Sequence, residues 1–147
     1  MVAKDDSFYH EYFSSLLNLM RDAGVHVTPT PYRGQFQIVY SWPDRVHIAV
    51  NVLRSTYEIR VDLTLKSGKA DEQYQLLEKD KREIAAIVGS ENLEWNPTPK
   101  TERQIVLRWN GIDPTEKSDW PRQHAWLASR LVTFRLAFGP RIEAWQR

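Results

Sequence analysis

The sequence predicts an α+β domain, in which an antiparallel sheet of about five strands packs against three helices. Two observations support this prediction. Apolar residues recur at helical spacing in three segments and at every second position in the segments between them. The links between the first three period-two segments are short, which favours antiparallel pairing. The predicted order is helix, three strands, helix, two strands, helix, which is typical of helices covering one face of a twisted sheet.

The first helix is predicted to begin at cap residues 5–7 and to end at Gly24. Its apolar side repeats over about four turns, as expected for an amphipathic helix. The residues of that side are Tyr9, Phe13, Leu16, Leu17 and Met20. The connector VTPTPYRG follows, and its two prolines and one glycine exclude regular structure.

A three-stranded meander is predicted next, with one apolar face on each strand. The strands cover residues 35–41, 46–53 and 57–65. In the first strand, the alternation places Phe36 and Ile38 inward and Gln37 outward. The turn between the second and third strands is predicted to pair Val52 with Tyr57. This register keeps the apolar residues of both strands together, whereas a slip by one residue would expose them.

The second half of the chain supplies two helices and two strands. A helix is predicted from about Asp71 to Val88, where Gly89 closes it. The segment NLEWNPTPKTERQIVLRWNGID is predicted to form two short strands around a proline link. The last helix is predicted to begin near Pro121 and to end at Phe138, before Gly139-Pro140. With 147 residues, we expect a single domain spanning residues 1–147.

The composition narrows the classes of function. The chain contains no cysteine, which excludes disulfides and thiolate metal sites. It contains no long apolar run, so we expect no membrane contact, and it starts without a secretion signal, so we expect a cytoplasmic location. The net charge of +1 gives no general attraction to nucleic acid. We expect no cofactor, and the four scattered histidines give no metal-ligand spacing.

A series of residues resembles the motif of restriction-type nucleases. Pro43-Asp44 is followed, after a gap, by the acid-x-base triplet Glu58-Ile59-Arg60. In that chemistry, one acid from each motif binds a shared Mg²⁺. The predicted register separates Asp44 from Glu58 by about 23 Å along the sheet, which one ion cannot bridge. Arg60 in place of lysine is also a poor participant in acid-base chemistry.

The polar face of the predicted sheet is the main candidate for a binding surface. The register places Asn51 opposite Glu58 and His47 opposite Asp62. A solvated face with cross-strand pairs is the simplest interpretation, and a contact surface for a partner is the functional one. The candidate binding residues on this face are Gln37, His47, Asn51, Glu58, Arg60 and Asp62. The enzymatic alternative is a divergent Mg²⁺-dependent nuclease that uses Glu58, Arg60 and Asp62, with His47 nearby.

The C-terminal end carries a local surplus of positive charge. From Trp120 onward there are five arginines and one acid. The arginines within the last helix point in different directions, so they form no stripe that reads a groove of DNA. Arg141 and Arg147, beyond the Gly-Pro pair, are candidates for weak phosphate contacts. A weak nucleic-acid-binding module is therefore a further alternative.

The second half of the chain resembles a known family. The segments are the helix YQLLEKDKREIAAIVGSENLEWNP, the strand ERQIVLRWN and the stretch DWPRQHAWLASRLVTFRLAFGPRI, and the opening helix FYHEYFSSLL is similar too. These segments resemble the prokaryotic domain of unknown function found at the C-terminus of restriction-type (PD-(D/E)XK) nuclease proteins. In such proteins the nuclease motifs are expected in the preceding domain. The resemblance implies a non-enzymatic accessory or interaction domain, associated with restriction or defence nucleases and a protein partner. The sequence sets no oligomeric state.

Overall fold

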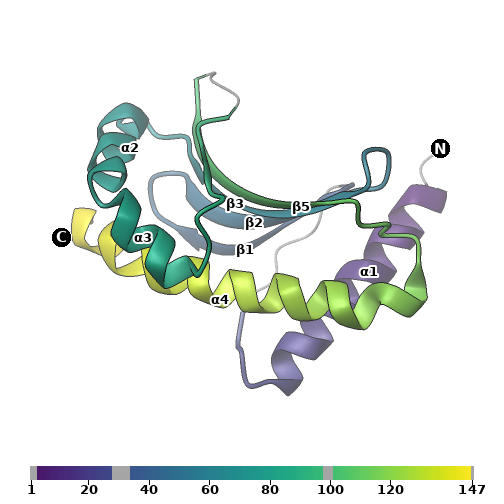
Figure 1. Cartoon of the computed structure of the whole chain (residues 1–147). Coiled ribbons are helices and arrows are strands. Elements are labelled where there is room, and N and C mark those ends of the chain that lie inside the picture. Colours follow the sequence, from purple (N-terminus) through teal and green to yellow (C-terminus); the bar gives the residue numbers. More distant parts are fainter. Residues whose placement is uncertain (1–2, 28–33, 98–100, 147) are drawn as a thin grey trace.

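The computed structural model describes residues 3–27, 34–97 and 101–146, with the side chains of residues 3–6 left aside. It is an α+β fold, as predicted, with one five-stranded antiparallel sheet in the order β1-β2-β3-β5-β4 (Figure 1). The strands are β1 (Phe36–Trp42), β2 (Val46–Leu53), β3 (Glu58–Leu65), β4 (Glu94–Trp95) and β5 (Arg103–Asn110). The helices are α1 (Ala3–Asp22), α2 (Ala70–Lys79), α3 (Lys81–Val88) and α4 (Trp120–Trp145), with a 3-10 turn at Lys117–Asp119.

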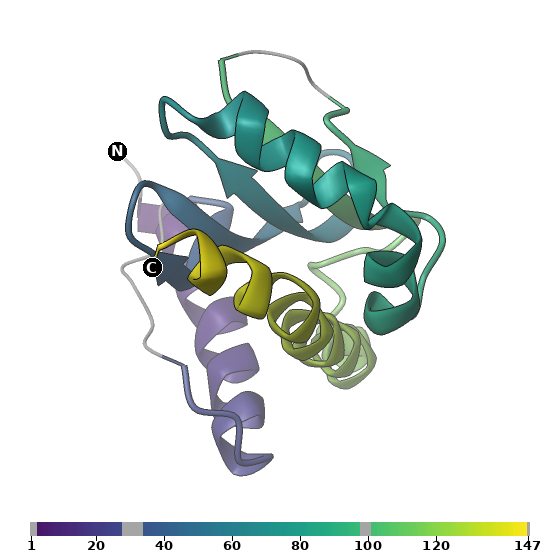
Figure 2. The same cartoon turned by 90° about the vertical axis from the view of Figure 1, so that its left-hand side faces the viewer.

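The helices α1, α3 and α4 cover one face of the curved sheet, while α2 lies against one end of it (Figures 1 and 2). Within the described part of the chain, no helix lies over the opposite face. We call the covered face the inner face and the other the outer face. Tyr12 on α1 donates a hydrogen bond of 2.7 Å to Gln123 on α4, which joins the two helices beneath the sheet.

The inner face forms the hydrophobic core. Antiparallel pairing aligns Val50 with Val61, and Val61 in turn with Leu107, and the rows through Ile59 and Leu63 on either side are apolar as well. The side chains of Val50, Val61 and Leu107 are buried, at 0–4% exposure. Leu127, Leu131, Phe134 and Phe138 of α4 pack against these rows and are fully buried. Burial of apolar area on this face is what holds the helices to the sheet.

The predicted register between β2 and β3 was wrong by two residues. Leu53 pairs with Glu58, and the loop between them has four residues. Tyr57 lies in that loop with a φ of 54° and is 55% exposed, so it does not begin the strand. A shift of two residues keeps the same side chains on each face, which is why the predicted faces of both strands were still right.

The first strand contains a bulge that reverses its predicted alternation. The register shifts between Ile38 and Tyr40, and Val39 is the extra residue. Gln37 consequently pairs with Val50 on the inner face and is 2% exposed, contrary to the predicted outward position. Ile38 instead pairs with Ala49 on the outer face.

The predicted helix over residues 71–88 is two helices, because the chain bends at Asp80. Two bonds hold this bend against α4. Arg141 Nε donates to Asp80 Oδ2 at 3.1 Å, and Arg141 Nη2 lies 3.1 Å from Glu83 Oε1. The sequence has no glycine or proline at this point, so its helical periodicity gave no sign of the bend.

The last helix continues through Gly139 and Pro140 to Trp145, whereas the sequence predicted an end at Phe138. Proline removes one backbone hydrogen bond from a helix interior. Burial compensates for this loss, because Ile142 is fully buried and Trp145 packs against the core. Arg141 Nη1 also donates to the carbonyl of Ala137 at 2.9 Å, beside the proline.

No helix in the described ranges combines the length and the apolar character that crossing a membrane requires. Some predicted features lie outside the described residues. They are residues 28–33 of the first connector, residues 98 and 99 of the proline link, and Arg147. The predicted order of elements is otherwise confirmed, with the second helix divided in two.

We predict that Gly139→Ala stabilises the protein by at most about 0.5 kcal/mol, because alanine is favoured over glycine in a helix interior but its Cβ is crowded by the following Pro140. The added methyl group would meet Trp42 Cζ2 and Arg135 Cγ at ordinary contact distances of 3.7 Å. Urea unfolding followed by circular dichroism measures the change. A helix that ended at Gly139 in a left-handed conformation would give the opposite sign, since alanine would then be strained.

Candidate functional site

The outer face carries most of the polar residues predicted to share a surface. It is formed by alternate residues of the three central strands: His47, Ala49, Asn51, Glu58, Arg60, Asp62, Thr64, Gln104, Val106 and Arg108. The predicted face was expected to be solvated. It is instead closely packed, with Glu58, Asp62 and Thr64 at 2–7% exposure. Long side chains on the neighbouring strands surround these three residues.

Asp62 lies at the centre of one hydrogen-bond network. Its Oδ2 accepts from Asn51 Nδ2 at 2.6 Å, and its Oδ1 accepts from Thr64 Oγ1 at 3.1 Å. Gln104 Nε2 donates in turn to Thr64 Oγ1 at 3.3 Å. Burial raises the pKa of the Asp62 carboxyl to about 6, while the Thr64 bond, the Arg60 charge and the Asn51 bond hold it lower than burial alone would. Asp62 therefore changes charge close to neutral pH.

A second network joins three strands through Arg108. Its Nη1 donates to Glu58 Oε2 at 2.9 Å, and its Nε donates to Glu94 Oε2 at 2.6 Å. Arg60 lies directly opposite Arg108 across β3 and β5. Two like charges in that position repel each other. Glu58 offsets the repulsion, because its Oε2 also lies 3.6 Å from Arg60 Nη1.

Arg60 keeps one unsatisfied group in this network. Its Nε is buried and has no hydrogen-bond partner. Its side chain is 28% exposed, so the end of the guanidinium reaches the surface of the outer face. A buried donor without a partner is costly, and such groups are uncommon in native proteins.

His47 was predicted to lie opposite Asp62 and lies opposite Thr64 instead. Burial lowers the pKa of His47, nearby Lys66 lowers it further, and Glu102 acts in the opposite direction. The imidazole is therefore held neutral at physiological pH. The imidazole and the Asp62 carboxyl belong to neighbouring rows and do not form the predicted pair.

The geometry does not fit a shared Mg²⁺ ion. Asp44 lies in the turn before β2, and Glu58 pairs with Leu53 at the other end of that strand. The separation between positions 44 and 53 is about 30 Å along the sheet. Glu58 and Asp62 are themselves about 13 Å apart along β3, whereas oxygen ligands lie within about 2.1 Å of Mg²⁺. Among the residues that the structure describes, no group of three acids or histidines is placed to hold a metal.

The basic C-terminal end is engaged within the protein. Arg141 lies within α4, contacts Asp80 and Glu83 and is 20% exposed; its contact with phosphate stays a prediction. Arg122 donates to both carboxylate oxygens of Asp119 through Nε and Nη2, and Arg130 Nη1 donates to the carbonyl of Val88. Arg135 stacks over the ring of Tyr40 at 4.8 Å. Arg147, the other predicted contact, lies outside the described residues.

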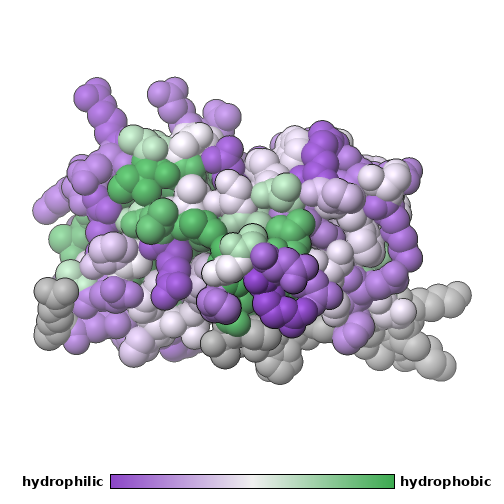
Figure 3. All heavy atoms as spheres, turned by 90° about the horizontal axis from the view of Figure 1, so that it is seen from below, coloured by the Kyte–Doolittle hydropathy of each residue, from purple (hydrophilic) through white to green (hydrophobic). Residues whose placement is uncertain are grey.

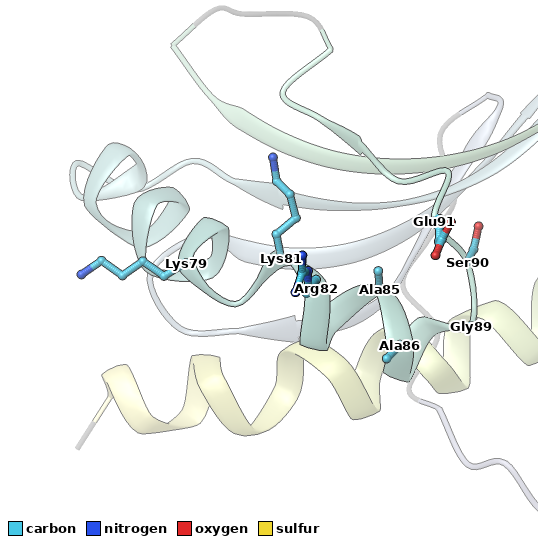
Figure 4. A pocket seen from close by; sticks show the side chains of 8 residues that line it. All are labelled: Lys79, Lys81, Arg82, Ala85, Ala86, Gly89, Ser90 and Glu91. Atoms are coloured by element: carbon cyan, nitrogen blue, oxygen red, sulfur yellow. The ribbon is translucent and has the colours of Figure 1, made fainter.

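A surface hollow of about 760 Å³ lies along α3 (Figure 4). Its floor is made by the small residues Ala85, Ala86 and Gly89. Lys79 and Lys81 lie at one end and point away from each other. Ligand sites bring a few polar groups together around a cavity, and this hollow does not.

Three residues of the outer-face networks, Gln104, Arg108 and Glu94, were not predicted. Leu107 faces inward in β5, so the alternation of that strand places the next residue, Arg108, on the outer face. Arg108 could therefore have been predicted from the sequence. Glu94 belongs to a strand of two residues, which is too short for a periodic pattern. Its role depends on the long connection that brings β4 beside β5.

Comparison with known proteins gives one match. The family model described as "Domain of unknown function (DUF4268)" covers residues 8–142. The chain belongs to this family. No curated protein and no solved structure matches it. The DUF4268 domain here therefore includes all five strands of the sheet and most of α1 and α4.

We predict that Asp62→Asn changes how the stability of this DUF4268 domain depends on pH. The folded state binds the Asp62 proton more tightly than the unfolded state, so this group adds stability that is fully present below about pH 4 and is lost as the pH rises through about 6. The stability of the variant relative to the native protein should therefore increase by about 2 kcal/mol between about pH 4 and about pH 7.5.

Urea unfolding at both pH values measures this change, and Asp22→Asn, at an exposed position on α1, is the matched control. The control makes the same change at an exposed carboxyl, and the change with pH for Asp62→Asn should exceed that of the control. An equal difference for Asp62→Asn at both values would contradict the raised pKa.

Proposed function

We propose that this domain is a non-enzymatic accessory module that contacts a partner protein through the outer face of the sheet. We further propose that it acts in the cytoplasm with restriction or defence nucleases. The proposal rests on one observation: most polar and charged side chains of the outer face are held by hydrogen bonds and ion pairs to one another. Such a face offers a fixed pattern of donors, acceptors and apolar patches, and it lacks clustered acids for metal-assisted hydrolysis.

The chemistry of the outer face suits protein contact. Half-buried Phe36 and Ile38 lie on this face beside β2, next to small buried Ala49. Arg60 and Arg108 keep about a quarter of their side chains exposed. Apolar patches next to partly exposed arginines are typical of the centre of protein interfaces. Because the network already fixes these side chains, they lose little conformational entropy when a partner binds.

The association with nucleases rests on the resemblance of the helical and strand segments described above. The cytoplasmic location agrees with a sequence that contains no cysteine. Direct nucleic-acid binding has less support, because Arg122, Arg130, Arg135 and Arg141 all contact groups within the domain. The divergent-nuclease alternative has less support, because Asp44, Glu58 and Asp62 lie too far apart to share one Mg²⁺ ion.

We predict that Ile38→Asp abolishes partner binding while leaving the fold intact. The change places a charge at the half-buried edge of the outer face, where an interface would have to desolvate it. The measurement is co-purification of tagged domain with proteins encoded beside its gene, a nuclease or methyltransferase first. Leu76→Asp on α2, where the native side chain is 46% exposed, is the matched control and should retain the partner.

The competing functions are tested on the same preparations. The native protein should not cut supercoiled plasmid with Mg²⁺, and it should show no salt-dependent affinity for DNA. Plasmid cleavage that Glu58→Gln abolishes would refute the non-enzymatic proposal. A partner that binds Ile38→Asp as well as the native protein would refute the assignment to the outer face.

A further inference from the structure

The surface of α4 that faces away from the sheet carries a series of apolar side chains between Arg122 and Glu143, with Arg135 beside it. Its exposed and half-exposed positions recur every three or four residues, which places them on one side of the helix. These positions, which we call the α4 stripe, are Ala125, Ser129, Val132, Leu136, Pro140 and Ala144. Leu136 is 60% exposed, which is more than any other large apolar side chain in the described part of the chain.

A helix on the surface of a soluble domain normally turns charged residues outward. The inner side of α4 is already apolar, because Leu127, Leu131 and Phe134 are fully buried against the sheet. Exposed apolar side chains that gather on one side of such a helix, rather than standing singly, are typical of a contact surface. Figure 3 shows apolar residues gathered on this side of the molecule, and Ile87 of α3, which is 37% exposed, extends them.

We propose that a second copy of this chain covers the α4 stripe, with the two α4 helices antiparallel across a two-fold axis. In such an interface, the same patch of both copies meets itself. The sizes of the side chains along the stripe suit such an arrangement, because a large side chain can meet smaller ones. Antiparallel packing centred between Val132 and Leu136 places the large side chain of Leu136 against Val132 and Ser129 of the other copy.

The charges at the two ends of the stripe point to the same occupant. Arg122 lies before the stripe begins, and its side chain is 59% exposed. Glu143 lies near the other end and is also exposed. At about 1.5 Å per residue, Arg122 lies about 18 Å and Glu143 about 14 Å from the centre, on opposite sides of it. Antiparallel packing therefore brings each Glu143 beside the Arg122 of the other copy, within reach of a long side chain.

Arg122 and Glu143 can each form a further hydrogen bond. Arg122 already binds Asp119 at 2.6 and 2.9 Å, but a guanidinium has five donors. Glu143 accepts one long hydrogen bond of 3.4 Å from Trp42 Nε1. The intermolecular pairs would add to these contacts without breaking them. Opposite charges would meet twice, because the two-fold axis repeats the pair.

The length of the α4 stripe sets the extent of the contact. α4 has 26 residues and is therefore about 39 Å long, and the stripe runs along most of it. Because the helices cover the inner face, the α4 stripe and the outer face lie on opposite sides of the domain, so this inference does not depend on the proposed function.

The first experiment is sedimentation equilibrium of the native chain over a range of concentrations. We expect a dimer, with twice the chain mass of 17.3 kDa. Leu136→Glu should raise the dissociation constant at least about tenfold, because it places a charge at the centre of the stripe. Leu76→Glu on α2 makes the same change at an exposed leucine elsewhere and should leave the dimer unchanged.

A charge exchange tests the antiparallel arrangement separately. Arg122→Glu and Glu143→Arg should each weaken the dimer, and the double variant should restore it, since the pair is re-formed with reversed charges. Circular dichroism confirms that each variant is folded. A native chain that stays monomeric at about 100 μM, or a dimer that Leu136→Glu leaves intact, would overturn the proposal. Failure of the double variant to recover would overturn the antiparallel arrangement.

Discussion

The position of β3 at the centre of the sheet is the constraint on which the rest of the structure depends. It pairs with β2 on one side and with β5 on the other, and seven of its eight residues are buried. Its inward residues demand a cover of helices, which α4 and α1 supply. Its outward residues include Glu58, Asp62 and Thr64, which can be buried only because side chains of β2 and β5 satisfy them. The central position of β3 thus explains both the hydrophobic core on one face of the sheet and the polar networks on the other.

The face on which each residue of the central strands lies could be predicted from sequence. Which residues lie opposite one another on neighbouring strands could not. Period-two spacing assigns each residue to a face, but a shift by two residues preserves that assignment. The row is set by the loop, where Tyr57 adopts a left-handed conformation that bulky residues rarely take. In β1, the bulge at Val39 broke even the assignment of faces, which moved Gln37 into the interior.

Tertiary packing explains the differences in the helices. Gly139-Pro140 is a strong local signal for a helix end, yet burial of Ile142 favours continuation. The bend at Asp80 has no local signal, and Arg141, sixty residues away in sequence, holds it. The candidate site shows the same division. Asn51, Glu58, Arg60 and Asp62 were correctly placed on one face, whereas Glu94 lies in a strand of two residues that is too short for a periodic pattern.

The buried carboxyl of Asp62 has a consequence for anything that settles on the outer face. A molecule that excludes the remaining water from around it would disfavour its ionised form still more. Docking would then draw a proton from solution, and the heat of association would vary with the ionisation enthalpy of the buffer. Association at this face would thus be coupled to the uptake of a proton by Asp62.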